Sequence, residues 1–479
     1  MKTVIEPYRN KTVEPIKFTT FEERQRLLKE VGYNLFQLRA EHVIVDLLTD
    51  SGTSAMSSEQ WSAMMRGDES YAGCSSFYRF QDAVKGIFGL PEVLPVHQGR
   101  AAERLLFSRL VKPGHIVPSN SHFDTTRANI ECLGAQALDL LCLEAADSAS
   151  DSAFKGNIDL SQVEKLLAKH DRDKIPFGMI TISNNAAGGQ PVSLQNIREY
   201  SALLKRYGIP FYIDGARFAE NAYMIKDREI GQGERNVRDI VSEIFSLADG
   251  TLVSAKKDGL VNMGGFIALR DKPLADLLKQ DLILTEGFPT YGGLNGRDLE
   301  AMAVGLQEVL CENYLLYRKQ SAAYLARGLC EQGVPIVQPP GMHAIYVNAT
   351  KMLPHIPAQE YPGQALVCAL YLEAGVRSCE IGAVMFGKAQ AGTPELARKP
   401  DLVRLALPRR LYNQSHYDYV IEAAGNVRKQ GEKIRGVRIV WEAPALRHFT
   451  AVFEPVNASL TSAPVHACKE IEKSSLSSI

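Results

Sequence analysis

Two residues in the middle of the chain, Asp214 and Lys257, have the types and the spacing to hold a cofactor and to move a proton. Asp214 directly follows the apolar run 210–213, and Lys257 comes shortly after the apolar run 251–253. The stretch between them is long enough for one helix and one crossover between neighbouring parallel strands. Many pyridoxal phosphate (PLP) enzymes use this pattern, in which the lysine forms a Schiff base with the cofactor and the aspartate keeps the pyridine nitrogen protonated. The pair therefore predicts a PLP site.

The tripeptide Gln98-Gly99-Arg100 predicts a phosphate-binding turn, because it precedes the helical pattern 101–106. Backbone N–H groups at the start of a helix bind phosphate, and glycine lets the chain approach closely. Arg100 can add a charge-assisted bond, and Ser254, in the same Ser-x-x-Lys segment as the lysine, can reach the same phosphate. Alone, the tripeptide is more typical of an ordinary strand-to-helix turn; beside the Asp214 and Lys257 pair, the phosphate-binding interpretation is favoured.

Four further polar side chains are candidates for the site. Asn185 lies in a polar loop after the apolar run 177–182, and Arg217 closely follows the aspartate. Both can approach the hydroxyl of the cofactor ring. Arg404 has a planar guanidinium that matches a substrate carboxylate, and Tyr71 is a candidate general acid. Each also has an ordinary interpretation, as a turn amide, a surface charge or a half-buried aromatic ring.

The elements that must position these side chains alternate between strands and helices. Apolar runs predict strands at 116–117, 137–141, 177–182, 211–213, 251–253 and 264–269, and helical patterns cover 193–207 and 240–247. This alternation predicts an α/β domain with a mostly parallel sheet covered by helices. Ligands of such sheets bind beyond the carboxyl ends of the strands, where the aspartate and the lysine are expected.

A second region begins after a long helical stretch that starts near Leu306. It has apolar runs at 334–337, 343–347 and 402–408 and a helical pattern at 365–374, which together predict a smaller α+β domain. The last residues are rich in serine and predict a disordered tail. We expect an N-terminal arm and small-domain segment at 1–56, a large PLP-binding domain at 57–310, a small domain at 311–454 and the tail at 455–479.

Composition argues against several classes of function. The chain has 54 Lys and Arg against 55 Asp and Glu, a net charge of −1, which gives no reason to expect a nucleic-acid partner. No run approaches the ~20 apolar residues of a membrane span, so no membrane partner is expected. The N-terminus lacks the apolar run of a signal peptide. The 8 cysteines are dispersed without metal-site spacing, which is typical of a reduced, cytoplasmic protein.

Long sequence motifs throughout the chain are similar to those of the β-eliminating lyases, the family of tryptophanases and tyrosine phenol-lyases. The similarity runs from Glu6 to Ala451. Its motifs include 46–53 (DLLTDSGT), 97–100 (HQGR), 187–193 (AGGQPVS), 216–223 (ARFAENAY), 254–258 (SAKKD) and 290–294 (TYGGL).

The resemblance implies a type I PLP-dependent fold, like that of aspartate aminotransferase, in a homotetramer activated by K⁺ or NH₄⁺. Lys257 is then the Schiff-base lysine, Asp214 pairs with the pyridine nitrogen and Phe123 stacks on the ring. The residues expected to bind the phosphate are Gln98, Gly99, Arg100 and Ser254, with Lys256 nearby.

The resemblance also implies where an amino-acid substrate and a cation bind. The residues expected at the substrate carboxylate are Thr49, Ser51, Asn185 and Arg404. Glu69, with the carbonyl groups of Gly52 and Asn262, is expected to bind the cation, since oxygen ligands suit a hard ion.

Three positions separate the two branches of the family. Asp124 stands where phenol-lyases carry Thr, Ile381 where they carry Arg, and His448 where they carry Phe. The Arg and Thr recognise a phenol hydroxyl, whereas Asp124 can accept a hydrogen bond from an indole N–H. With Phe449 also expected in the substrate pocket, these residues predict tryptophan catabolism: L-tryptophan and water give indole, pyruvate and ammonia.

In this reaction Lys257 removes the α-proton, and a proton goes to the indole carbon that leaves. Tyr71, Asp124 and His448 are all candidates for that second transfer. A tyrosine phenol-lyase is an alternative, because the short segment 111–115 resembles that branch; a cysteine-conjugate carbon–sulfur lyase is another. A non-catalytic PLP-fold scaffold is disfavoured by the presence of all the central cofactor-site residues.

Overall fold

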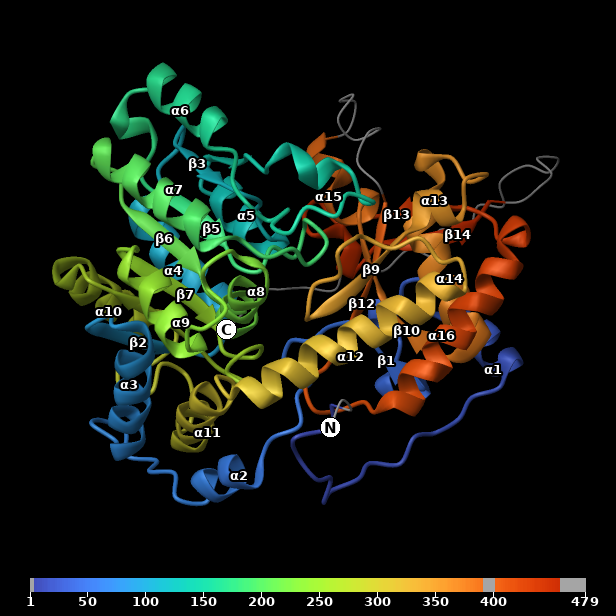
Figure 1. Ribbon diagram of the computed structural model, residues 1–479, viewed down its shortest axis with the longest axis horizontal. Helices are drawn as coiled ribbons and strands as arrows, with labels where there is room; N and C mark the ends of the chain where they lie inside the picture. The colour runs from blue at the N-terminus through green and yellow to red at the C-terminus, as the bar shows by residue number, and fades with distance from the viewer. Residues whose placement is uncertain (1–3, 391–400, 457–479) are drawn as a thin grey trace, which may run out of the picture.

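Two units lie side by side in the computed structural model, which describes residues 4–390 and 401–456 (Figure 1). The long helix α12 (Glu312–Glu331) runs from the larger unit into the smaller one. The remaining helices of the larger unit are α2 (Ser58–Met64), α3 (Ser75–Phe88), α4 (Gly99–Leu110), α5 (Asp124–Glu131), α6 (Leu160–Lys169), α7 (Leu194–Arg206), α8 (Phe218–Arg228), α9 (Val237–Ser246), α10 (Lys272–Thr285) and α11 (Gly296–Glu308).

A mixed sheet forms the centre of the larger unit, with the strand order β2-β8-β7-β6-β5. Its strands are β2 (Glu92–Val96), β5 (Gly178–Thr181), β6 (Phe211–Asp214), β7 (Gly250–Ser254) and β8 (Gly265–Leu269). β5, β6 and β7 are parallel, and β8 is antiparallel to both of its neighbours. The carboxyl ends of β6 and β7 therefore lie next to each other, which brings Asp214 close to the segment that carries Lys257.

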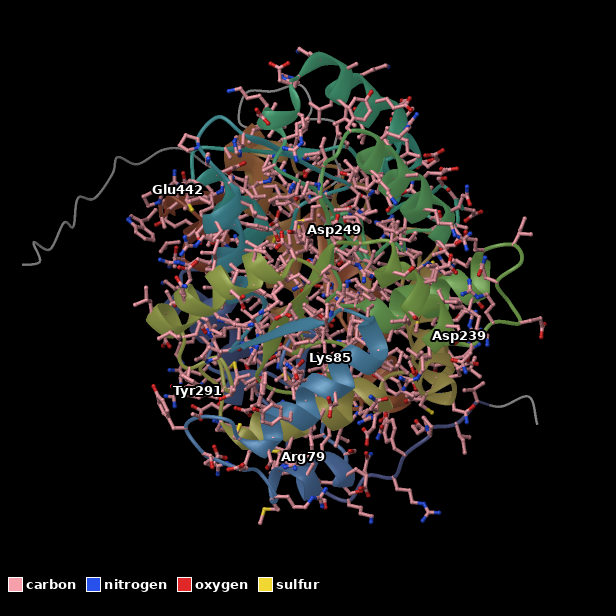
Figure 2. All side chains as sticks on the ribbon, turned by 90° about the vertical axis from the view of Figure 1, so that its left-hand side faces the viewer. Arg79, Lys85, Asp239, Asp249, Tyr291 and Glu442 are labelled. Atoms are coloured by element: carbon pink, nitrogen blue, oxygen red, sulfur yellow. The ribbon has the colours of Figure 1, made fainter. Side chains whose placement is uncertain are left out.

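The apolar residues of these strands alternate between two cores, because successive side chains of a strand point to opposite faces. Met179 and Tyr212 belong to the core covered by α4 and α10, whereas Ile180 and Ile213 belong to the core covered by α3, α7 and α9. Both faces of the sheet are thus buried, which explains the continuous apolar runs in the sequence. Figure 2 shows α3 in front of the sheet, with Arg79 and Lys85 on it.

A further parallel pair, β3 (Ile116–Ser119) and β4 (Gln136–Asp139), extends this sheet beyond β5. Asn120 joins the two parts: its amide nitrogen donates to the carbonyl of Thr181 at 3.0 Å, and its oxygen accepts from the N–H of Thr181 at 2.9 Å. The buried asparagine thus replaces a backbone ladder, and the residues after it enter α5, which carries part of the site.

The smaller unit is built on the antiparallel sheet β11-β12-β9. Its strands are β9 (Ala344–Asn348), β11 (Cys379–Ile381) and β12 (Leu402–Ala406), with the two-stranded pairs β1 (Val45–Asp46) with β10 (Val376–Arg377) and β13 (Val437–Trp441) with β14 (Val452–Pro455). Its helices are α1 (Phe21–Glu30), α13 (Ala349–Met352), α14 (Pro362–Ala374), α15 (Ala383–Gln390) and α16 (Gln414–Lys429). A separate hydrophobic core joins α1, the middle of α12, α14 and α16.

The expected alternation of strands and helices is present, with local differences. Residues 334–337 form no strand; Ile336 makes only an isolated bridge to Val347. Two helices, α8 and α9, stand between β6 and β7 where one was expected. We propose that the cores of the larger unit correspond to the predicted domain 57–310, and that the core of the smaller unit corresponds to the predicted segments 1–56 and 311–454. Almost all of the predicted tail lies outside the described residues. Among the described residues, no helix is long and apolar enough to cross a membrane.

Candidate active site

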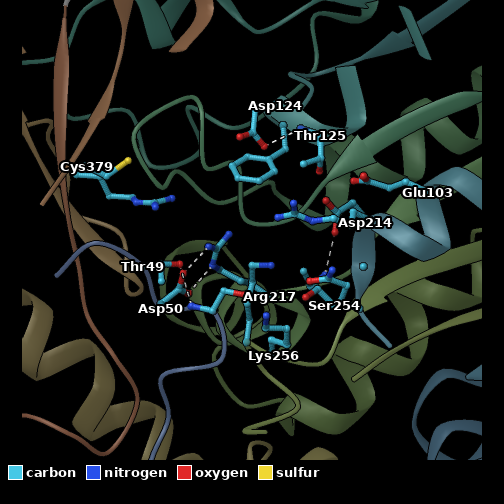
Figure 3. Close-up of a pocket in the computed structure, with 18 of the residues that line it drawn as sticks. Thr49, Asp50, Glu103, Asp124, Thr125, Asp214, Arg217, Ser254, Lys256 and Cys379 are labelled. Atoms are coloured by element: carbon cyan, nitrogen blue, oxygen red, sulfur yellow. Dashed lines mark hydrogen bonds and ion pairs between the residues drawn. The ribbon is translucent and has the colours of Figure 1, made fainter. Parts of the chain in front are cut away.

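A cavity of about 260 Å³ lies where the carboxyl ends of β6 and β7 face the smaller unit (Figure 3). Most of the residues predicted from the sequence line it: Thr49, Ser51, Gln98, Gly99, Arg100, Phe123, Asp124, Asp214, Arg217, Ser254, Lys256, Lys257, Arg404, His448 and Phe449. Tyr71, Glu69, Gly52, Asn262, Asn185 and Ile381 do not line it.

The amine of Lys257 is held in its neutral form more readily than an exposed lysine would be. Burial and the positive charge of Arg217 lower the pKa of Lys257 to about 8. About a tenth of the amine is then neutral at pH 7, far more than at the ordinary lysine pKa. A neutral amine is what both a nucleophile and a proton acceptor require.

The carboxyl group of Asp214 has room for a cationic partner. Burial raises the pKa of Asp214, and the nearby Lys257 opposes the rise. Its Oδ1 accepts one hydrogen bond, from the N–H of Ala216 at 3.1 Å. A positively charged N–H donor in the cavity would favour the ionised carboxylate, which is the environment that a protonated pyridine ring offers.

Arg217 is fixed by a residue that the sequence reasoning missed. Its Nε and Nη2 donate to the two oxygens of Asp50 at 2.9 and 2.8 Å (Figure 3). The buried Arg409 donates to the same carboxylate at 2.9 Å. Although burial acts to raise the pKa of Asp50, the two guanidinium groups hold it well below its usual range.

Arg409 extends this network to the segment that carries the lysine. It donates to Asp258, the residue after Lys257, at 2.8 Å and to Glu220 at 2.9 Å. Asp258 also accepts hydrogen bonds from the first N–H groups of α8, those of Ala219 and Glu220. The ends of β12, β6 and β7 are therefore joined by buried ion pairs.

The predicted phosphate turn has the shape and charge of an anion site. Gln98 caps α4 in an extended conformation without a side-chain bond to the helix, so the first N–H groups of the helix are open to a ligand. A Cβ atom on Gly99 would lie 2.7 Å from the Cβ of Ser254, so only glycine permits this approach. Burial and the neighbouring charge of Arg100 lower the pKa of Lys256. Two cations and free N–H groups fit a phosphate group.

A second anion site faces the smaller unit. Arg404 donates to Asn185 Oδ1 at 3.1 Å and to the carbonyl of Leu48 at 2.8 Å. The Nε of Arg404 and the amide nitrogen of Asn185 are buried without a partner among the described residues. Buried donors of this kind normally find an acceptor, and a substrate carboxylate between them and Thr49 would supply it.

Asn185 itself is held by two residues that the sequence reasoning missed. The hydroxyl of Tyr346 donates to Asn185 Oδ1 at 2.6 Å, and His343 Nε2 lies 3.2 Å from the same oxygen. Burial and Arg217 keep the pKa of His343 well below its ordinary value, so the ring is neutral. Asn185 therefore supports Arg404 from beside the cavity and does not line it.

The far end of the cavity is aromatic and poor in charge. His448 Nε2 lies 3.0 Å from Asp124 Oδ2, but without the alignment of a hydrogen bond, and both ring nitrogens of His448 lack a hydrogen-bond partner among the described residues. Phe36, which was not predicted, meets the rings of His448 and Phe449 edge-on. The expectation that Ile381 lines this end is not met: Cys379, on the same strand, lines it instead.

Tyr71 and Glu69 lie in a separate, shallower hollow. Tyr71 is 70% exposed and packs against Phe288 and Tyr291, and Figure 2 shows Tyr291 at the margin of the molecule. Glu69 accepts hydrogen bonds from the N–H groups of Gly296 and Arg297. Within one chain, Tyr71 is therefore not brought to the cavity.

The three expected cation ligands are also not brought together. Asn262 donates to the carbonyl of Gly52 at 2.9 Å, whereas Glu69 belongs to the hollow described above, which neither residue lines. Among residues 4–390 and 401–456, no group of three or more His, Cys, Asp or Glu side chains is placed to hold a metal ion.

The residues that the sequence reasoning missed differ in whether a sequence motif could have indicated them. Asp50 lies inside the motif 46–53, whose length alone marks it as functional. Glu103 lies in the helical pattern 101–106 beside the motif 97–100. Arg409 and Phe36 are separated in sequence from every motif, and only the packing of distant segments brings them to the cavity or its network.

The fold and the cavity define a PLP-dependent enzyme of the type I class. The aromatic aminotransferase of Pyrococcus horikoshii superposes with a TM-score of 0.59 at 13% identity, over 86% of this chain and 99% of that one. The threonine aldolase of Leishmania major does so with a TM-score of 0.55 at 14% identity, over 80% and 99% of the two chains. At such identities the likeness concerns the fold, and it confirms the expected fold class.

Sequence comparison places the chain within that class. A family model described as β-eliminating lyase matches residues 46–423. The tryptophanase of Hyphomonas neptunium is 57% identical over 454 residues, which are 95% of this chain and 100% of the relative. The tyrosine phenol-lyase of Symbiobacterium thermophilum is 46% identical over 452 residues, 94% and 99% of the two chains. The chain belongs to the β-eliminating lyase family, as its motifs predicted, and is a lyase.

Proposed function

We propose that this lyase splits L-tryptophan into indole, pyruvate and ammonia with PLP as its cofactor. The observation that carries the proposal is the far end of the cavity, where Asp124 and His448 lie close together and the ring of His448 packs against those of Phe36 and Phe449. A flat apolar ring with one N–H donor suits this end. The sequence has Ile381 at the position where phenol-lyases carry the arginine that recognises a phenol hydroxyl.

Residues of the larger unit would hold the cofactor. Gln98, Gly99, Arg100, Ser254 and Lys256 would bind its phosphate, Phe123 would stack on its ring, and Asp214 would bind the ring nitrogen. When bound, PLP supplies an electron sink for the charge left after the α-proton is removed.

The substrate would be oriented by its carboxylate. Arg404 and the amide of Asn185 offer buried donors without partners, and Thr49 and Ser51 lie on the adjoining segment. Binding of the carboxylate at these residues would place the α-carbon of the substrate near the amine of Lys257. The lowered pKa of Lys257 lets this amine accept the α-proton at neutral pH. Arg217, held by Asp50, keeps a fixed positive charge beside that amine.

Asp124 would accept the indole N–H, and His448 is placed to stabilise Asp124 or to pass a proton. A proton must also reach the indole carbon that leaves. Tyr71 is too far outside the cavity of its own chain to serve, but its exposed ring could enter the cavity of a second subunit. We therefore propose an oligomer, the homotetramer implied by the family, in which this residue crosses a subunit boundary.

The same assembly would complete a cation site. Glu69 is exposed near the surface hollow, and the carbonyl groups of Gly52 and Asn262 lie elsewhere on the chain. We propose that Glu69 of one subunit and the two carbonyls of another bind K⁺ or NH₄⁺, and that the enzyme is cytoplasmic.

The test is release of indole from L-tryptophan, compared with release of phenol from L-tyrosine under the same conditions, each in K⁺ and in Na⁺ buffer. We expect indole release to exceed phenol release and to be higher in K⁺. Phenol release above indole release would assign the chain to the other branch. Turnover of S-alkyl cysteine with neither aromatic product would make it a carbon–sulfur lyase.

A further inference from the structure

Glu103 is a buried carboxyl group at the cavity that none of the steps above uses. It lies in the second turn of α4, is only 7% exposed and lines the cavity beside Asp214 (Figure 3). Its Oε1 is 2.6 Å from the hydroxyl of Thr126, and its Oε2 accepts from the amide of Asn129 at 3.1 Å. These bonds tie α4, which carries the phosphate turn, to α5, which begins at Asp124.

No cation compensates Glu103. In the described residues it forms no ion pair, and the charged groups that act on it most strongly are Asp214 from β6 and Asp124 from α5, both negative. β7 and β8 pack against α4 but carry no titratable side chain. On α10 and β2, Asp281 is paired with Arg109, and Glu92 with Lys279. Burial raises the pKa of Glu103 to about 7, although the bond from Thr126 opposes the rise.

We propose that Glu103 is a positioning residue that holds a proton of its own at neutral pH. When Glu103 loses this proton, it adds a second negative charge behind Asp214. A protonated Glu103 can donate to the hydroxyl of Thr126 across the 2.6 Å contact. An ionised Glu103 strengthens the negative field at the ring nitrogen of the cofactor, so the ring binds its proton more tightly. Glu103 therefore makes the charge of the cofactor site depend on pH in the neutral range.

This inference rests on the proposed cofactor site but not on which side chain leaves, so its first test uses the apoenzyme. Below about pH 4.5 both the folded and the unfolded chain keep the proton of Glu103. Between about pH 4.5 and pH 7 only the unfolded chain releases this proton. Glu103 therefore lowers the stability of the fold increasingly as the pH rises through this range. We expect the melting temperature of Glu103→Gln, minus that of the wild type, to grow between pH 5 and pH 7 and to level off above pH 7.5.

Two matched variants make the assignment specific. Thr126→Val removes the hydrogen bond that favours the charged carboxylate of Glu103. In this background, the pH at which the melting-temperature difference caused by Glu103→Gln levels off should therefore be higher. Glu131→Gln removes one surface carboxylate from the same helix, α5, and should give a difference in melting temperature without that rise. A flat difference for Glu103→Gln between pH 5 and pH 8 would overturn the proposal, because no proton would then be held there.

The second test is a pH titration of the visible absorption of the holoenzyme without substrate. The wild type should show a transition near pH 7 that Glu103→Gln lacks and Thr126→Val shifts upward. A merely structural role would leave this transition in place in Glu103→Gln, and that result would overturn the action on the cofactor. If neither protein shows a visible band, the cofactor site itself is wrong; if the titrations behave as expected but no indole forms, only the choice of substrate is wrong.

Discussion

The two ends of the cavity are built differently. At the end of Asp214 and Lys257, the supporting charges are bonded to one another: Asp50 binds two guanidinium groups, and Arg409 binds three carboxylates. At the end of Asp124 and His448, polar atoms are buried without well-aligned partners inside a ring of aromatic side chains. At the first end, called the complete end below, the supporting charges are paired before any substrate arrives, although Arg409 Nε and Glu220 Oε2 lack a hydrogen-bond partner among the described residues. At the second, the incomplete end, both ring nitrogens of His448 need a ligand to supply their hydrogen bonds.

This difference separates the chemistry from the choice of substrate. A prearranged set of charges costs no reorganisation during the reaction, so it suits steps that are the same for every amino acid. A buried polar group without a partner costs about 1–3 kcal/mol, and a ligand that supplies the missing partner recovers that amount. Selectivity therefore belongs to the incomplete end, and the following predictions test that division.

The largest effect is expected from Lys257→Ala, which removes the group proposed to take the α-proton. Activity should fall by more than about 10⁴-fold with every substrate, because a positioned general base and a covalent attachment are lost together. Indole release and the visible absorption band of the holoenzyme measure the two losses. Lys205→Ala, an exposed lysine on α7, should change neither. Retention of the band in Lys257→Ala would show that another residue binds the cofactor.

Asp50→Asn tests whether the charges of the complete end depend on one another. The variant leaves Arg217 and Arg409 buried with less compensation, so the free energy of unfolding should fall by about 3–5 kcal/mol. Urea unfolding measures it. Asp276→Asn, which removes an exposed carboxylate on α10, should have little effect. If both substitutions had equally small effects, the ion pairs around Asp50 would not stabilise the site.

How far the sequence predicted these two ends follows from the physics of each. The complete end was largely predictable, since its residues follow strands whose apolar runs are unmistakable and the carboxyl ends of parallel strands meet at one edge. Arg409 was not, because a buried arginine far from any motif looks like a surface charge until the fold closes around it. Tyr71 was a candidate general acid from its residue type and Glu69 was implied by the family resemblance, but a single chain does not bring them to the cavity.

The incomplete end was predicted less accurately because it depends on which residue of a strand reaches the cavity. Asp124 and His448 were identified by the branch they resemble, and they lie next to each other at this end of the cavity. Ile381 was expected there as well, but it lies opposite Leu402 in the sheet, whereas Cys379 lies opposite Arg404 and lines the cavity. Cys379 and Ile381 share a face of β11, and only the position of that strand relative to Arg404 determines which of them reaches the cavity.

A double variant, Ile381→Arg with Asp124→Thr, tests selectivity at the incomplete end. It adds a donor for a hydroxyl and removes the acceptor for the indole N–H, so indole release from tryptophan should fall by about 10²-fold or more. Release of the thiol from S-alkyl cysteine should change far less, because that leaving group does not use this end. Unchanged tryptophan turnover would mean that these positions do not set selectivity.

A smaller effect is expected from His448→Phe. The substitution keeps the aromatic wall and removes the partner of Asp124, so kcat for tryptophan should fall by roughly 10- to 100-fold, at or below the usual range for general acid–base residues. The ratio of tryptophan to S-alkyl cysteine turnover is the measurement, since a good leaving group needs no acid. Equal losses with both substrates would show that His448 supports the fold of the cavity and not the departure of indole.

The smallest effect concerns the amine at the complete end and is a matter of pH. The pKa of Lys257, lowered to about 8, means that the neutral amine is about half of the total at pH 8 and falls nearly tenfold per unit below it. Because only the neutral amine attacks a carbonyl group, the rate at which the apoenzyme takes up PLP should rise with pH up to about 8 and then level off. The growth of the visible band after mixing measures this rate. In Asp50→Asn the positive charges of Arg217 and Arg409 are less compensated, so the levelling-off should move to lower pH. If the pH profile did not move, the lowered pKa would be due to burial alone, and the network around Asp50 would position Lys257 without tuning it.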